Sequence, residues 1–436
     1  MLISFCMENI YSFNEAVTLD MTASAIKAHS YSLLEAGRYK LLPVAAIYGA
    51  NASGKSNLVQ GLEDLLSAIS GGVFRSFGFA LDGKGGMGQL CRSELHFFIN
   101  LCSDGSKEDL VECKYTIQAI AYSNKYVKEE LRCIPPAKKS LTRVFLREWD
   151  EAEGKWSLKI GTSPYVKTFS KEINYVSEME NSQEALLLTA LGKRAQFPLF
   201  DKIYSWAVQG VSSYKEPYMT GNFGPNYIDE KNDLVAFIND EKTKDALYSF
   251  IRSINPLIQG ISLVSAAEPT KIRTKNKDKD GYFLFFDYHI SGEDNEFYRL
   301  LMSVKESKGV FTALHLFPKI FSILHNGGLL IVDELENSLH PLLMAKIVNL
   351  FTSPDTNPGK GQLIFTTHNV LLMDKKYFRQ DEIIFVEKDN STGSSSLYRL
   401  SDIDGVRSDL DFCKNYIYGA FGALPNLTEN EENVPL

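Results

Sequence analysis

The run G-A-N-A-S-G-K-S at residues 49–56 constrains this chain most, because it joins two segments of different periodicity. The apolar residues 44–48 before it are typical of a buried strand, and Leu58, Leu62, Leu65 and Ile69 after it recur at helical spacing. A strand, a glycine loop and a helix with the pattern G-x-x-x-x-G-K-S predict a phosphate-binding loop. The alternative is a glycine turn that only connects a strand to a helix.

Each residue type in this loop has a physical reason. Gly49 and Gly54 let the backbone turn tightly and approach an anion. The loop N–H groups and the helix N-terminus direct positive partial charge at phosphates. We expect Lys55 to reach the β- and γ-phosphates and the Ser56 hydroxyl to ligate Mg²⁺.

Composition excludes several classes of protein. The 436 residues are 44% hydrophobic, which is enough for two or three domains. The net charge of −8 argues against a basic nucleic-acid clamp. Six cysteines without paired or zinc-type spacing indicate free thiols in a reducing compartment, and hence a cytoplasmic location. No apolar run reaches about 18 residues and the N-terminus lacks a basic segment, so neither a membrane span nor a secretion signal is expected.

The pattern along the chain predicts an α/β fold with insertions. Short alternating segments between 91 and 160, separated by turn residues, predict an antiparallel sheet, and the region 165–257 reads as mainly helical, with one helix expected over 233–254. Runs at 329–332, 363–366 and 383–386 are apolar on both faces and predict buried parallel strands. We therefore expect four parts. Residues 1–90 form the N-terminal part of the α/β domain with the phosphate loop, and 91–164 form an antiparallel β lobe. Residues 165–258 form an inserted helical domain, and 259–436 form the C-terminal part of the α/β domain.

Two of the parallel strands end in side chains suited to phosphate chemistry. Asp333 and Glu334 follow the first run, at the sheet edge where ligands bind in α/β proteins. We expect Asp333 to hold Mg²⁺ and Glu334 to orient or deprotonate an attacking water. His368 follows the second run and is placed to hydrogen-bond a γ-phosphate. The plain alternatives are two acids that open a turn and a structural histidine.

Two further segments are candidate anion sites. Ser307 and Gly309 precede an apolar helical segment, so they form either a second phosphate site that serves another chain's nucleotide or a simple helix cap. The polar loop 271–281 carries five basic residues together with Asp278 and Asp280, and is either a nucleic-acid contact or a solvated hairpin tip.

In this order the motifs resemble the ABC-type ATPase heads of the SMC, RecF and OLD group. The run 49–57 matches the form G-x-N-x-S-G-K-S-N, residues 333–341 resemble the Walker B and D-loop segment, and 366–368 the switch histidine. Residues 9–13 resemble the start motif N-F-x-S-F, and 418–425 resemble the endings of bacterial ATPases of abortive-infection and other phage-defence systems. The resemblance covers roughly 1–70 and 295–425.

The resemblance implies a P-loop NTPase fold that uses ATP and Mg²⁺. It adds Asn51, Ser53 and Asn57 to the nucleotide-binding residues and makes Glu334 and His368 the catalytic ones. It further implies an ATP-sandwich homodimer completed by Ser307 and Gly309 and a separately encoded effector, a nuclease or toxin, in antiviral defence. The signature departs from L-S-G-G, since residues 306–309 read E-S-K-G. Gln89 is a weak candidate for the Q-loop glutamine, no long coiled coil interrupts the heads, and no Toprim nuclease domain is expected after residue 425.

Two other functions stay open at this point. The first is a DNA-repair or recombination ATPase that binds DNA directly, for which the loop 271–281 is the main support. The second is a non-catalytic interaction protein with a relict nucleotide fold, against which the intact Lys55, Ser56, Asp333, Glu334 and His368 argue.

Overall fold

The computed structural model describes residues 1–79, 86–102, 109–136, 138–214, 227–229, 232–265, 281–289, 297–301, 306–407 and 409–425. The chain forms two compact units: unit 1 comprises Met1–Ser213, Ile323–Glu334 and Val348–Leu436, and unit 2 comprises Tyr214–Ser322 and Leu335–Ile347. The strands of the expected β lobe and the helices between 164 and 209 belong to unit 1 with the phosphate loop.

Unit 1 contains the predicted parallel sheet. Its strand order is β11 (Val211–Tyr214), β16 (Leu329–Val332), β17 (Gln362–Thr366), β5 (Val44–Tyr48), β18 (Ile383–Lys388) and β19 (Ser395–Arg399). The pairs β16·β17, β17·β5 and β18·β5 are parallel, and β19 is antiparallel to β18. Every residue of β5, β16 and β17 is buried, which confirms the interpretation of the continuous apolar runs.

The second sheet of unit 1 is the predicted antiparallel one. Its order is β10 (Lys155–Ile160), β9 (Thr142–Asp150), β8 (Tyr126–Cys133), β7 (Leu110–Ile120), β6 (Leu90–Asn100), β1 (Leu2–Glu8) and β2 (Val17–Asp20). The N-terminal strand β1 pairs with β6 and so brings the first residues of the chain into this sheet, which the sequence did not reveal. A small hairpin joins β3 (Leu34–Ala36) and β4 (Tyr39–Leu41).

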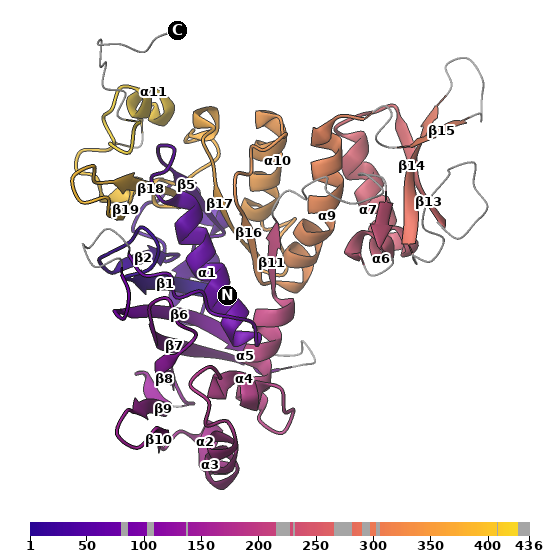
Figure 1. Cartoon of the computed structure of the whole chain (residues 1–436). Helices are drawn as coiled ribbons and strands as arrows, with labels where there is room; N and C mark the ends of the chain where they lie inside the picture. The colour runs from indigo at the N-terminus through magenta and orange to yellow at the C-terminus, as the bar shows by residue number, and fades with distance from the viewer. Residues whose placement is uncertain are drawn as a thin grey trace, which may run out of the picture. The chain divides into compact units, whose positions relative to one another are not determined.

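One apolar core joins the two sheets of unit 1 through helix α1 (Lys55–Ile69). Figure 1 shows α1 beside β5 and the antiparallel strands β1 and β6. Leu58, Leu62 and Leu65 of α1 pack in one cluster with Ile47 of β5 and Phe97 of β6. The remaining helices of unit 1 are α2 (Pro164–Lys167), α3 (Ser170–Met179), α4 (Leu187–Gly192), α5 (Pro198–Gln209) and α11 (Phe412–Ile417), with short 3-10 turns η1 (Ser30–Ser32), η2 (Val370–Leu372), η3 (Gln380–Glu382) and η4 (Leu400–Asp402).

A fully buried ion pair fastens the antiparallel sheet to α4. Arg147 and Glu129 are 0% exposed and lie 2.9 Å apart, on neighbouring strands β9 and β8. The Glu129 carboxylate also accepts hydrogen bonds from the backbone N–H groups of Leu187 and Leu188, at the start of α4. The Arg147 guanidinium lies 4.1 Å from the centre of the Trp156 ring. The pair thus satisfies helix N–H groups that would otherwise be buried without partners.

Unit 2 corrects one prediction. The expected single helix over 233–254 is two helices, α6 (Asp233–Asn239) and α7 (Glu241–Arg252). Asp240 has an extended backbone, and its side chain accepts a hydrogen bond from Thr243 N, so it ends one helix and caps the next. The apolar spacing continues through the break, so the spacing alone predicts one helix. The helix is interrupted because the short Asp240 side chain bonds to the backbone.

The rest of unit 2 is a small antiparallel sheet and parts of two helices. The strands are β12 (Tyr227–Asp229), β14 (Gly281–His289), β13 (Ile258–Ser265) and β15 (Phe297–Leu301). Helix α9 (Lys308–Asn326) contributes its residues up to Ser322, and α10 (Pro341–Thr352) its residues up to Ile347. Residues 271–280 of the basic loop lie outside the described residues.

Glu382 makes the stability of unit 1 depend on pH. Its side chain is 1% exposed, and burial raises its pKa from 4.5 to about 8. Because the folded protein binds this proton more tightly than the unfolded chain, the contribution to stability is complete below about pH 4.5 and is lost as pH rises through about 8. We expect Glu382→Gln to reduce the fall in unfolding free energy between pH 6 and pH 8.5, measured by urea titration. An unchanged slope in the variant would assign that pH dependence to other groups.

Candidate nucleotide site

The loop between β5 and α1 has the backbone that a phosphate cradle requires. Gly49, Ala52 and Gly54 have positive φ values of 152°, 61° and 113°. A Cβ on Gly49 would lie 2.2 Å from the carbonyl oxygen of Val386, and one on Gly54 would lie 2.6 Å from the hydroxyl of Ser395. Both glycines are therefore required by close packing as well as by backbone conformation.

Lys55 is the first residue of α1 and is 5% exposed. Its Nζ donates to the carbonyl oxygens of Gly49 and Ala50, at 3.0 and 2.8 Å. The ammonium is thus held over the loop, in the place where it can exchange these carbonyl oxygens for phosphate oxygens. Burial of this charge within a glycine loop is expected of an anion site.

The acidic strand end lies against the start of α1. Ser56 Oγ donates to Asp333 Oδ1 at 3.2 Å, although the two residues are 277 positions apart. The parallel registers of β16, β17 and β5 place Asp333 and the loop at the same edge of the sheet. The predicted convergence of Ser56 and Asp333 is therefore present in the structure.

Thr366 is a site residue that the sequence analysis did not single out. It ends β17, is fully buried, and donates from Oγ1 to Asp333 Oδ1 at 2.6 Å. The same hydroxyl accepts a hydrogen bond from Glu334 N at 2.7 Å. Glu334 has φ 55°, in the left-handed region that is costly for a residue with a side chain, and it is exposed. The sequence feature that could have identified Thr366 is a threonine at the end of an otherwise apolar strand.

The remaining predicted residues are placed as follows. His368 is exposed and follows β17 by two residues, at the same sheet edge as Asp333. Asn51 is exposed on the loop, whereas Ser53 is buried. Asn57 Nδ2 donates to Ser12 Oγ at 3.0 Å, so this amide joins the start motif to α1.

Ser307 and Gly309 belong to unit 2 and stand at the start of α9. Val310 N donates to Ser307 Oγ at 3.4 Å, which is a helix cap, and a Cβ on Gly309 would lie 2.5 Å from the carbonyl oxygen of Ser338. Glu306, beside them, accepts from Asn255 Nδ2 at 2.8 Å. The predicted helix cap is thus present at Ser307. Gln89, the candidate Q-loop glutamine, accepts a hydrogen bond from Ala121 N through its backbone carbonyl.

We expect Thr366→Val to impair the acidic strand end without unfolding the chain, because valine keeps the shape and removes the hydroxyl. Asp333 then loses a donor and Glu334 N loses its acceptor, so nucleotide turnover should fall about 10-fold or more while the melting temperature changes little. Thr189→Val is the matched control, since this buried hydroxyl donates to Ile69 O away from the acidic residues. Equal turnover in both variants would show that the Thr366 hydroxyl does not contribute to the site.

The strand order, the glycine loop and the acidic strand end together define a P-loop NTPase fold with an added antiparallel sheet, as predicted. Residues 211–374 match a protein family described as "AAA domain, putative AbiEii toxin, Type IV TA system". The match includes Ser307, Asp333, Glu334 and His368 but not the loop at 49–57, and spans well under half of the chain. This part of the chain is therefore similar to AAA-type ATPase domains. No curated protein matches the chain.

Solved structures of SMC heads are similar over most of the chain at low identity. An SMC head bound to the C-winged helix domain of ScpA is 12% identical, with a TM-score of 0.47 over 91% of this chain and 97% of that one. The SMC head domain from Thermotoga maritima is 12% identical, with a TM-score of 0.35 over 91% and 98%. An SMC head with an extended coiled coil, bound to the C-terminal domain of ScpA derived from Pyrococcus furiosus, is 13% identical, with a TM-score of 0.38 over 91% and 96%. Because these TM-scores lie below 0.5, the fold rests on the strand order and the loop.

None of the helices in the described part of the chain combines the length and the apolar character of a membrane span.

Proposed function

We propose that this chain binds ATP and hydrolyses it to ADP and phosphate. The observation that supports this most directly is the 3.2 Å contact between Ser56 Oγ and Asp333 Oδ1. A glycine loop with a buried lysine explains phosphate binding alone, whereas the added carboxylate at the loop's hydroxyl fits a metal-assisted reaction.

The residues present fit Mg²⁺, which takes oxygen ligands and commonly uses one or two protein groups together with phosphate oxygens. Ser56 and Asp333 would hold the ion, whose chemistry is to neutralise charge on the β- and γ-phosphates. Lys55 and the loop N–H groups, with Asn51, Ser53 and Asn57 beside them, bind and orient the phosphates.

Glu334 and His368 act on the transferred group in this proposal. The carboxylate of Glu334 accepts a proton from the attacking water, and the bond from its backbone N–H to Thr366 fixes the turn that carries it. His368, on the adjacent strand end, hydrogen-bonds the γ-phosphate. Two chains would sandwich two nucleotides, each completed by Ser307 and Gly309 of the second chain at the start of α9.

The nucleotide cycle is proposed to control a separately encoded effector, a nuclease or a toxin, in bacterial antiviral defence. The description of the matching family, which names a toxin and a type IV toxin–antitoxin system, supports this context. So does the resemblance of residues 418–425 to the endings of abortive-infection ATPases. By the same resemblance the chain is proposed to group with the OLD-type ATPases, and its free cysteines support a cytoplasmic location. The basic loop that would favour a DNA-binding ATPase lies outside the described residues.

Glu334→Gln tests hydrolysis and dimerisation together. Because the amide cannot accept the proton, we expect turnover to fall by about 10²–10⁴-fold while ATP binding is retained. The variant should form an ATP-dependent dimer, measured by light scattering after gel filtration. Adding Ser307→Arg to it should return the monomer while each chain still binds ATP. Glu151→Gln, at an exposed glutamate of unit 1 outside these motifs, is the matched control and should hydrolyse ATP normally. Wild-type turnover in the Glu334 variant would contradict the proposed role.

A further inference from the structure

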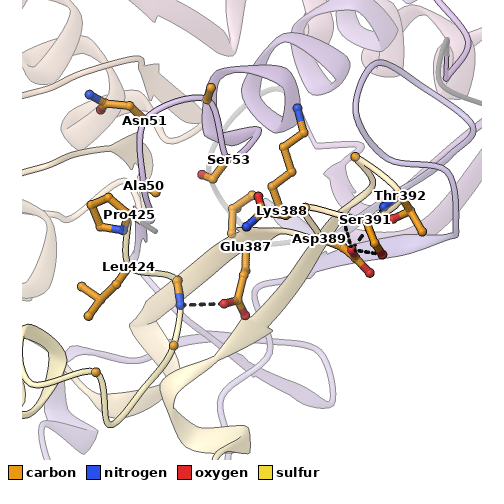
Figure 2. A pocket seen from close by; sticks show the side chains of 17 residues that line it. Ala50, Asn51, Ser53, Glu387, Lys388, Asp389, Ser391, Thr392, Leu424 and Pro425 are labelled. Carbon is orange, nitrogen blue, oxygen red and sulfur yellow. Dashed lines mark hydrogen bonds between the residues drawn. The ribbon is translucent and has the colours of Figure 1, made fainter. Parts of the chain in front are cut away.

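A cavity of about 990 Å³ adjoins the phosphate loop within unit 1. Three segments line it: loop residues 50–53, residues 386–393 at the end of β18 and its turn, and residues 419–425 of the C-terminal segment. Figure 2 shows side chains from all three segments around this space. The volume is at the upper end of the range usual for small-molecule sites, so it accommodates more than a phosphate.

The C-terminal wall of the cavity is fixed by specific bonds. Glu387 accepts a hydrogen bond from Ala423 N at 3.2 Å, and Tyr398 OH donates to Phe421 O at 2.8 Å. Tyr416 OH donates to Ala423 O at 3.0 Å. The segment is thus held on β18 and β19 before any ligand arrives, which lowers the ordering cost of binding.

The loop wall carries a polar group without a partner. Ser53 is 2% exposed, and its Oγ has no hydrogen-bond partner among the residues that the structure describes. Its backbone oxygen is already engaged, since Ser395 Oγ donates to it at 2.6 Å. A buried hydroxyl without a partner is unfavourable, and a ligand in the cavity is a means of satisfying it.

The two ends of the cavity differ in chemistry. Ala50, Leu424 and Pro425 lie together at one end, where they form an apolar surface. Asp389, with Ser391 and Thr392, lies at the other end. Asp389 accepts hydrogen bonds from Ser391 and Thr392, and these bonds lower its pKa, so the carboxylate stays ionised and acts as an acceptor. A cavity with an apolar surface at one end and hydroxyls and a carboxylate at the other suits a planar heterocycle joined to a sugar.

We propose that this cavity binds the nucleoside half, base and ribose, of the nucleotide whose phosphates occupy the loop. The inference rests on the proposed ATP binding and extends it. The base packs against Leu424 and Pro425, and Asp389 accepts from the ribose hydroxyls. The C-terminal segment therefore contacts the nucleotide directly.

Calorimetric titration with ATP and with inorganic triphosphate separates the two proposals. The wild-type protein should bind ATP at least 10-fold more tightly than triphosphate. Leu424→Asn should weaken ATP binding at least 5-fold and leave triphosphate binding unchanged. Leu257→Asn, at an exposed leucine of unit 2, is the matched control and should bind both ligands as the wild type does.

The outcomes are distinct. Equal affinity of the wild type for ATP and triphosphate would overturn the nucleoside site and leave the phosphate site standing. If Leu424→Asn weakened the binding of ATP and of triphosphate equally, the C-terminal wall would have only a structural role. That result would also overturn the nucleoside site. Failure of the wild type to bind either ligand would refute the proposed function itself. Photolabelling of the wild type with 8-azido-ATP needs no variant: label in peptides covering 386–393 or 419–425 supports the site, and label confined elsewhere refutes it.

Discussion

Lys55→Met should lower ATP turnover by about 10²–10³-fold, because it removes the cation that faces the developing charge on the phosphates. Methionine keeps the length and apolar stem of the side chain, so the packing of α1 in the core should be retained. The lysine is 5% exposed, and its ammonium donates to the carbonyl oxygens of Gly49 and Ala50.

The measurement is steady-state ATP hydrolysis together with calorimetric binding of ATP and of inorganic triphosphate. The binding of both ligands should be abolished or greatly weakened, since the proposed contact of the ammonium is with phosphate oxygens rather than with the base. Lys125→Met, at an exposed lysine of the same unit, is the matched control and should hydrolyse ATP at the wild-type rate. Retained turnover in the Lys55 variant would show that the phosphates do not bind at this loop.

Arg147→Met should destabilise the protein by about 3–5 kcal/mol, because it leaves the buried carboxylate of Glu129 without its counter-charge. Glu129→Gln should cost a similar amount by leaving the guanidinium uncompensated. The double variant should cost clearly less than the sum, since neither charge then remains. Denaturant unfolding of the four proteins measures the coupling.

The comparison pair is Lys159 and Glu148, which joins the same sheet through side chains that are 63% and 43% exposed. Lys159→Met should cost less than about 1 kcal/mol, as is usual for solvent-exposed ion pairs. Additive losses in the double variant of Arg147 and Glu129 would show that the two residues act independently and would contradict a shared network.

Local patterns predicted those parts of the molecule whose conformation depends on neighbouring residues. The phosphate loop follows from Gly49 and Gly54, whose backbone angles other residues rarely adopt. The strands at 329–332 and 363–366 follow from apolar runs that need burial on both faces. The break at Asp240 was missed because the helical spacing continues through it, and one capping side chain outweighs that spacing.

Contacts between distant segments were harder to predict from the sequence. Thr366 was part of a recognised motif, yet its bridging of Asp333 and Glu334 depends on the register of β16 and β17. Ser12 was noted only within the start motif, and its bond to Asn57 arises where the N-terminal turn meets α1. The partners Glu129 and Arg147 lie on strands whose pairing no spacing along the sequence specifies.

By itself the sequence determined the kind of loop, the buried strands and the chemical types at the strand ends, because backbone sterics and side-chain periodicity act over a few residues. Only the tertiary structure decided that Ser56 meets Asp333 and that residues 419–425 form a wall beside the loop. Strand order and register create these contacts, and they depend on how the whole core packs rather than on any local preference.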